Sequence, residues 1–168
     1  RGYKPNTSVH MGQLKRALKM LKKAKKPLFL AGGGVNIARA NKVFTEVVEK
    51  TNVPVVTTIM GRGAVPTNHP LFIGNLGMHG QYAANMAVGE CDLLFSIGTR
   101  FNDRITGKLH AFAPNAEIVH IDIDTASISR NIQVHVPIVA DALEAVTKMN
   151  EYVEPCETGK WLEQIRGW

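Results

Sequence analysis

Short apolar runs alternate along this chain with longer segments in which apolar and polar residues recur at helical spacing. The apolar runs lie at residues 28–31, 53–58, 92–97, 117–123 and 136–139, and their length is that of buried strands. The helical segments are residues 9–24, 39–50, 81–88 and 141–149. Strands that alternate with helices predict an α/β fold: a Rossmann-like, doubly wound, mainly parallel β-sheet with helices on both faces.

Local signals mark several ends of these elements. Ser8 is a candidate N-cap for the first helix, and Pro27 ends that helix. Asp141 is a candidate N-cap for the helix after the fifth strand. Residues 61–80 are rich in Gly, Pro and Asn and predict a long loop, a feature that in compact domains is usually functional or disordered. Residues 157–167 predict either a last helix or a tail that leaves the domain.

The length of 168 residues suggests one domain. We expect that domain at residues 1–150, followed by a linker at residues 151–168 that leads to a further domain. Hydrophobic residues make up 45% of the chain and charged residues 20%, which argues against disorder. Cys91 and Cys156 lie far apart without a CxxC spacing, so we expect no disulfide framework and no zinc site.

The chain has no apolar run near the roughly 18 residues of a membrane span, and its start does not resemble a signal peptide. We therefore expect a cytoplasmic protein. Its net charge of +6 is local, because residues 1–45 hold 11 of the 20 Lys and Arg and no acidic residue. These cations could contact nucleic-acid phosphates or form the solvated face of an amphipathic helix. We favour the helix, since apolar residues separate the charges and no aromatic residues interleave with them. We expect neither a nucleic-acid nor a membrane partner.

Ligands of such sheets bind beyond the carboxyl ends of the strands, where this sequence places glycines and polar residues. Gly32, Gly33 and Gly34 follow the first strand and would let backbone N–H groups approach a diphosphate. The signal is weak, because Ile37 stands where the dinucleotide fingerprint has its third glycine. A simple tight turn explains the triplet equally well.

Residues 98–104 follow another buried strand and carry two guanidinium groups, Arg100 and Arg104, suited to a diphosphate or a planar ring. The alternative is a salt-bridged surface loop, which would not need flanking glycines. Asp122 ends a strand and could accept hydrogen bonds from a ribose, or could cap a helix or lie solvated at the strand end. Asp141 has the same ambiguity, with capping favoured.

Residues 76–80 (LGMHG) precede a predicted helix. Met78 could pack against an aromatic ligand, and His79 could line a ligand or act as a general base. We favour a ligand-lining histidine, because no carboxylate or nucleophile is paired with it. The chain has no Walker loop, no GxSxG elbow and no HExxH motif. We therefore expect a nucleotide-binding module with no catalytic residue and no metal ligand of its own.

Four strings, in this order, carry a resemblance to a known family: LGMHG at residues 76–80, GTRFNDRITG at 98–107, FAP at 112–114 and HIDID at 120–124. Together they resemble the central domain of the acetolactate synthase (acetohydroxyacid synthase) catalytic large subunit, a thiamine-diphosphate enzyme. The resemblance covers essentially the whole chain.

The resemblance implies an enzyme that uses thiamine diphosphate and Mg²⁺ to decarboxylate pyruvate and join the product to a second 2-keto acid, in branched-chain amino-acid biosynthesis. It implies a central domain that binds FAD without net redox chemistry, and partners that are the flanking domains, further copies in a homodimer or tetramer, and a regulatory small subunit. The Gly-Asp-Gly metal motif and the activating glutamate of the family belong to flanking domains and are absent here, so we expect this domain to be inactive alone.

The resemblance also implies which residues contact FAD. They are Gly32, Gly33, Gly34, Thr58, Ile59, Met60, Leu76, Gly77, Met78, His79, Gly98, Thr99, Arg100, Arg104, Ile105, Asp122, Ile123, Asp141 and Ala142.

Other functions compete with this one. The chain could be the central domain of another thiamine-diphosphate enzyme, either a pyruvate oxidase with redox-active FAD or a 2-keto acid decarboxylase with an empty domain, although LGMHG speaks against both. It could be a ligand-free structural spacer. A sirtuin-like NAD domain shares the architecture but needs a catalytic histidine over nicotinamide and usually a zinc module, and neither is visible here.

Overall fold

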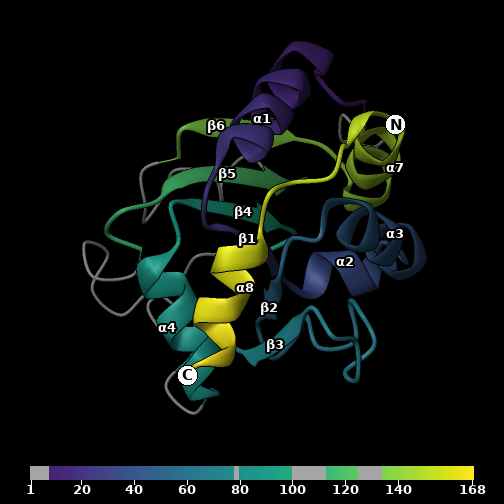
Figure 1. The fold of residues 1–168 in the computed structure, drawn as a ribbon. Helices are drawn as coiled ribbons and strands as arrows, with labels where there is room; N and C mark the ends of the chain where they lie inside the picture. The colour runs from purple at the N-terminus through teal and green to yellow at the C-terminus, as the bar shows by residue number, and fades with distance from the viewer. Residues whose placement is uncertain (1–7, 78–79, 100–112, 125–133) are drawn as a thin grey trace.

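The computed structural model describes residues 8–77, 80–99, 113–124 and 134–168. In these residues the strands form one parallel sheet with the order β3-β2-β1-β4-β5-β6, covered by helices on both faces (Figure 1). The strands are β1 Pro27–Ala31, β2 Val55–Thr57, β3 Phe72–Asn75, β4 Leu93–Ile97, β5 Glu117–Asp122 and β6 Val136–Val139. The helices are α1 Met11–Lys23, α2 Gly33–Ile37, α3 Asn41–Thr51, α4 Tyr82–Glu90, α7 Ala142–Tyr152 and α8 Gly159–Arg166. The predicted doubly wound α/β fold is confirmed.

The strand order reverses between β1 and β4. From β1 the chain builds outward through β2 to β3, then returns to place β4 on the other side of β1 and continues to β5 and β6. β1 and β4 run parallel, with Phe29 opposite Phe95 and Ala31 opposite Ile97. All carboxyl ends therefore meet at one edge of the sheet, and its centre is the reversal between β1 and β4, where such folds hold their ligands.

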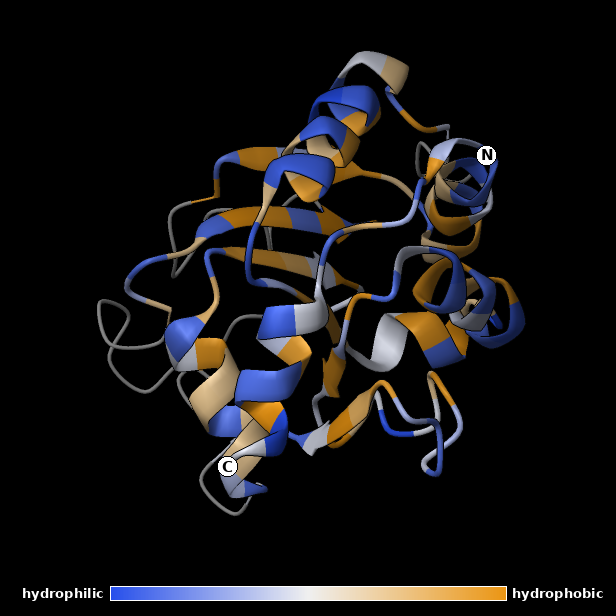
Figure 2. Cartoon of the chain, in the orientation of Figure 1, coloured by the Kyte–Doolittle hydropathy of each residue, from blue (hydrophilic) through white to orange (hydrophobic). Residues whose placement is uncertain are grey.

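The sheet separates two hydrophobic cores. Much of its strands is hydrophobic and therefore orange in Figure 2. On one face, helices α1, α3 and α7 cover a core in which the Phe29 ring makes edge contacts with Phe44 and Phe95, each at 5.5 Å between centroids. On the other face, α4 and α8 cover a smaller core that includes Cys91. Burial raises the pKa of Cys91 to about 12, so this thiol stays protonated at neutral pH.

Two helix starts test the predicted caps. Asp141 caps α7 as predicted, because its Oδ2 accepts the backbone N–H groups of Leu143 at 3.0 Å and Glu144 at 3.3 Å. The prediction of Ser8 as the cap of α1 was wrong. His10 is the N-cap, and its Nδ1 accepts the Gln13 N–H at 3.1 Å. Histidine is an uncommon N-cap, so composition alone favoured the serine.

The predicted loop at residues 61–80 contains β3, a strand that was not predicted from the sequence. β3 is a four-residue edge strand that pairs with β2 alone, and the register between the two strands shifts between Val55 and Val56. Gly74 lies within it at φ +146°, so the usual apolar alternation is broken. Only the short apolar run before Gly74 could have indicated the strand.

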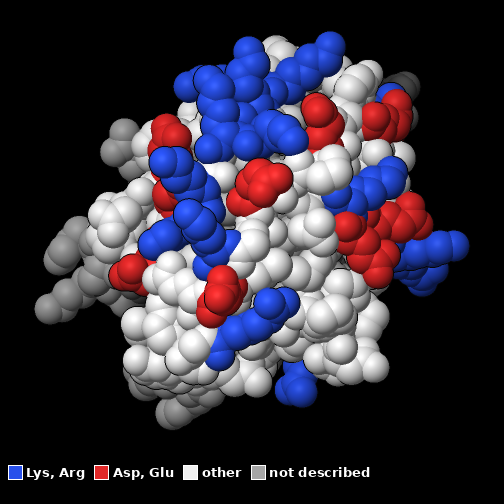
Figure 3. Space-filling model, in the orientation of Figure 1, with Lys and Arg blue, Asp and Glu red and all other residues white. Residues whose placement is uncertain are grey.

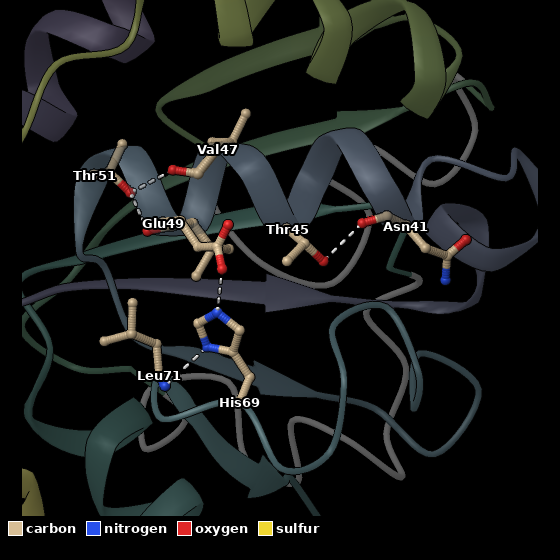
Figure 4. A network of polar contacts seen from close by, with 8 residues as sticks. Asn41, Thr45, Val47, Glu49, Thr51, His69 and Leu71 are labelled. Atoms are coloured by element: carbon tan, nitrogen blue, oxygen red, sulfur yellow. Dashed lines mark hydrogen bonds and ion pairs between the residues drawn. The ribbon is translucent and has the colours of Figure 1, made fainter.

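The segment before β3 is attached to α3 through His69 (Figure 4). Its Nδ1 accepts the Leu71 N–H at 3.1 Å, and its Nε2 lies 3.1 Å from the Glu49 Oε2. His69 thereby stabilises the turn before β3 and connects that turn to α3. The Glu49 carboxylate is largely exposed, so the ion pair itself contributes little to stability.

The C-terminal residues fold back onto the sheet. Trp161 of α8 is 1% exposed, and its Nε1 donates to the Pro27 carbonyl at 2.8 Å. Its ring meets that of Trp168 edge-on, with 6.1 Å between centroids. Residues 157–167 therefore supply a helix that completes the second core. The prediction that residues 151–168 also lead to a further domain stays a prediction.

Candidate ligand site at the carboxyl edge

The ends of β1 and β4 meet through glycine backbone. Gly32 N–H donates to the Ile97 carbonyl at 2.9 Å, and Gly34 N–H donates to the Gly98 carbonyl at 3.0 Å. A Cβ on Gly34 would lie 2.7 Å from the Gly98 Cα, and Gly98 itself has φ +65°. The triplet therefore does not form the simple tight turn that was the alternative. It begins the short helix α2 and lets two loops touch at the reversal of the strand order.

Apolar side chains stand in solvent beside this glycine contact. Ile59 and Met60 follow β2 and are 76% and 73% exposed. A Cβ on Gly33 would lie 3.0 Å from the Met60 Cβ, so Met60 borders the glycine triplet directly. Thr58 before them is buried, and its N–H donates to the Ala31 carbonyl at 3.1 Å. Neighbouring apolar residues that stand in solvent indicate a surface that a ligand or another protein surface covers.

Two asparagines hold the loop that carries Met60. The Asn36 Nδ2 of α2 donates to the Met60 carbonyl at 2.8 Å and to the Arg62 carbonyl at 3.1 Å. The Asn41 Nδ2 donates to the Gly63 carbonyl at 2.9 Å. These side-chain amides connect α2 and the start of α3 to the loop after β2. Neither asparagine was among the site residues predicted from the sequence.

The start of the LGMHG string continues the same edge beyond β3. Leu76 is buried, and its N–H donates to the Thr57 carbonyl at 2.8 Å. Gly77 has φ +123°, and the Asn85 side chain of α4 binds both its N–H and its carbonyl at 3.0 Å. Met78 and His79 lie outside the described residues. An amide on the helix after a glycine-rich string is the signal that could have pointed to Asn85.

On the other side of the reversal, the ends of β4 and β5 are joined by a buried histidine. The His120 Nε2 lies 2.7 Å from the Thr99 carbonyl oxygen and 3.7 Å from the Asp122 Oδ2. Burial lowers the pKa of His120, while the hydrogen bond to Thr99 and the Asp122 charge act in the opposite direction. His120 belongs to the HIDID string, but the sequence alone indicated no role for it.

The predicted ribose ligand Asp122 lies at the end of β5, where its Oδ1 accepts the Asp124 N–H at 3.0 Å. Ile123 beside it is exposed. Asp141 and Ala142 follow β6, one strand further from the reversal than β5, and the Asp141 carboxylate caps α7. The remaining predicted residues lie outside the described part of the chain: Arg100, Arg104 and Ile105.

The structure thus brings most of the described candidates to one edge. The glycine triplet, Gly98 and Thr99 occupy its centre, and the residues after β2 lie against them. Leu76 and Gly77 lie on the β3 side, and Asp122 and Ile123 on the β5 side. Such an elongated row of glycine backbone, apolar side chains and a terminal carboxylate can bind an extended dinucleotide across several strands.

A groove lies near the opposite edge of the sheet, where the strands begin. It has a volume of about 500 Å³ and lies between α1 and residues 152–156. Lysines of α1 surround it, and Figure 3 shows the basic cluster over this helix. Leu14, Ala17 and Leu21 of α1 are buried, which confirms the amphipathic helix. Among the described residues, no helix is both long and apolar enough to cross a membrane.

Comparison with known proteins identifies the family. The family model described as "Thiamine pyrophosphate enzyme, central domain" matches residues 14–149. A probable acetolactate synthase large subunit of Methanococcus aeolicus is 50% identical over 90% of this chain and 26% of its own length. That of Methanocaldococcus jannaschii is 46% identical over 98% of this chain and 28% of its own. The acetolactate synthase isozyme 3 large subunit of Escherichia coli is 44% identical over 100% of this chain and 29% of its own length.

The chain spans less than a third of the length of these relatives. The resemblance in the four sequence strings, the parallel sheet with its reversal between β1 and β4, and these matches agree. This chain belongs to the thiamine pyrophosphate enzyme family, as a central domain of the kind found in acetolactate synthase large subunits.

Proposed function

We propose that this chain is the FAD-binding central domain of an acetolactate synthase large subunit. The complete enzyme would condense pyruvate with a second 2-keto acid in branched-chain amino-acid biosynthesis. Its thiamine diphosphate and Mg²⁺ would be bound by flanking domains, and it would assemble as a homodimer or tetramer with a regulatory small subunit. The domain alone would lack catalytic activity, and the enzyme would be cytoplasmic.

The observation that carries the FAD proposal is the pair of exposed side chains beside the glycine contact. Ile59 and Met60 stand in solvent next to the centre of the carboxyl edge, although their neighbour Thr58 is buried. A planar ring system laid over them would remove this apolar surface from water. In a ligand-free spacer, these two large apolar residues beside the reversal of strand order would be covered only by another protein surface.

The polar groups of the edge suit the rest of a dinucleotide. Gly33 opens α2, so its N–H belongs to the first turn, where backbone donors favour a diphosphate. Arg100 would add a guanidinium to the diphosphate. The Asp122 Oδ2 lies outside the turn that Oδ1 makes, which leaves a carboxylate oxygen for ribose hydroxyls. In this enzyme class the bound FAD would supply no net redox chemistry, so these residues bind and orient it.

The first test is a flavin titration with matched charge substitutions. Met60→Glu places a carboxylate in the proposed ring contact, and we expect the Kd for FAD to rise at least tenfold. Tyr152→Glu is the control, because Tyr152 is also half-exposed, at 49%, but lines the groove at the opposite edge. Flavin fluorescence quenching gives the Kd, and thermal unfolding gives the stability of each variant without ligand.

Saturable binding should raise the free energy of unfolding by about 2.7 kcal/mol at a ligand concentration of 100 Kd. An equal Kd for FAD in both variants and in the unchanged chain would contradict FAD binding at this edge. No binding at all, by the full encoded polypeptide as well as the domain, would favour the spacer. In the complete enzyme, flavin absorbance that stays constant during turnover of pyruvate would distinguish the synthase from an oxidase.

A further inference from the structure

A pair of polar residues interrupts the apolar layer where β4 and β5 lie side by side. His120 of β5 is opposite Ser96 of β4 in the register, and both side chains are fully buried. The residues that flank them along the two strands are apolar and belong to the core under α1, α3 and α7: Phe95, Ile97, Val119 and Ile121. A buried imidazole destabilises the fold unless hydrogen bonds compensate for its lost hydration. The group that accepts a hydrogen bond from His120 therefore indicates the role of this residue.

That partner is a backbone carbonyl at the ligand edge. The His120 Nε2 is 2.7 Å from the Thr99 oxygen. A carbonyl oxygen can only accept, so Nε2 must carry the proton and donate it. The nearest charged group described is Asp122, whose Oδ2 is 3.7 Å from Nε2 and beyond good hydrogen-bond distance. Burial lowers the pKa of His120, so the ring is predominantly neutral at pH 7.

The Thr99 carbonyl belongs to the backbone that borders the glycine contact. The preceding residue, Gly98, donates its N–H to the Ile121 carbonyl at 2.8 Å and accepts the Gly34 N–H at 3.0 Å. Gly98 and Thr99 are therefore held by α2, by the β5 backbone and by the His120 ring. The last of these sets the direction of the Thr99 carbonyl, from which the chain continues to Arg100.

We propose that His120 is a positioning residue for FAD: its Nε2–H holds the Thr99 carbonyl and so orients the backbone of Gly98 and Thr99 toward the dinucleotide. The inference rests on the proposed FAD site. His120 is buried and does not touch the ligand. It acts only through the Thr99 peptide group.

The test compares three variants of the full encoded polypeptide in the flavin titration. His120→Leu fills the space but removes the donor, and we expect the Kd for FAD to rise about three- to tenfold, the effect of one net hydrogen bond. His120→Gln keeps an N–H donor of similar reach and should bind within about twofold of the unchanged protein. Ser96→Ala is the matched control, because it alters the buried neighbour without contact to Thr99 and should also bind within about twofold.

The outcomes separate this inference from the proposed function. If the unchanged protein binds FAD and His120→Leu binds equally well, His120 has no positioning role and the FAD site stands. If the unchanged protein does not bind FAD at all, both fail. A merely structural histidine would lower the melting temperature of the ligand-free His120→Leu and His120→Gln variants together, with no difference in Kd between them.

A measurement without FAD keeps the inference falsifiable if a variant fails to fold. Nitrogen-15 chemical shifts of the His120 ring report which nitrogen carries the proton. We expect the neutral Nε2–H form at pH 7, and protonation at a lower pH than that of an ordinary histidine, because burial lowers the pKa of His120. A neutral ring with its proton on Nδ1 would overturn the proposal, because Nε2 could then not donate to the Thr99 carbonyl.

Discussion

At the scale of single residues, the glycines at the ends of β1 and β4 are required by the atoms that face them. Gly98 has φ +65°, and a Cβ there would lie 2.8 Å from the Gly34 Cα and 2.9 Å from the Val35 nitrogen. Both obstacles are backbone atoms, so no side-chain rotation can relieve them. A Cβ on Gly89, inside α4, would meet no such atom within 4 Å, so Gly89 is an ordinary helical position.

These two glycines therefore predict opposite effects of one substitution. We expect Gly98→Ala to lower the free energy of unfolding by about 2–4 kcal/mol, from left-handed backbone and overpacking together. Gly89→Ala should raise it by about 0.5–1 kcal/mol, because alanine favours the helix. Urea unfolding of both variants measures the two values. A Gly98→Ala protein as stable as the unchanged chain would contradict the close backbone contact described here.

At the scale of elements, α8 is a structural part of the domain because Trp161 binds Pro27 at the start of β1. The Nε1–H to carbonyl bond is 2.8 Å, and the ring is among the largest fully buried side chains. We expect Trp161→Phe to lower the free energy of unfolding by about 1–3 kcal/mol, since the buried Pro27 carbonyl loses its donor and a small void remains. Thermal and urea unfolding measure the loss.

Trp168→Phe is the matched control for that change, because Trp168 is only half-buried at the edge of the same cluster. It should lower the free energy of unfolding by less than about 1 kcal/mol. Equal losses for the two substitutions would mean that the Pro27 hydrogen bond does not anchor α8.

The elements also show how far sequence reasoning reaches. The strands of the sheet centre, β1 and β4, are uniformly buried and, apart from Ser96, apolar, and their runs predicted them to within a residue or two. β3 was missed because an edge strand of four residues with an internal glycine carries almost no periodic signal. The N-cap of α1 was misplaced by two residues, because the side chain that binds the first turn is a histidine. The sequence alone does not show which of two nearby polar residues will cap a helix.

At the scale of the whole molecule, the strand order brings together candidate residues that lie far apart in the sequence. Gly34 and Gly98 lie far apart in the sequence, yet their backbones touch because the strand order reverses between β1 and β4. The HIDID and LGMHG strings indicated candidate residues through the family resemblance, and the structure places Leu76, Gly77, Asp122 and Ile123 of these strings after β3 or at the end of β5. The supports of the site, Asn36, Asn85 and His120, follow only from three-dimensional contacts.

The molecule also has two chemically different edges. The carboxyl edge combines glycine backbone with exposed apolar residues, whereas the amino edge carries the lysines of α1 around a groove (Figure 3). A dinucleotide could in principle be drawn to the lysines by its diphosphate charge alone. Locating bound FAD on one of these edges therefore tests the proposed site more directly than affinity does.

The decisive measurement is hydrogen–deuterium exchange of the full encoded polypeptide with and without saturating FAD. We predict slower exchange in peptides that contain Ile59 and Met60, Gly77, and Arg100, with unchanged exchange in α1 and residues 152–156. Protection confined to α1 and residues 152–156, or no protection at the carboxyl edge at saturating FAD, would contradict the proposed site.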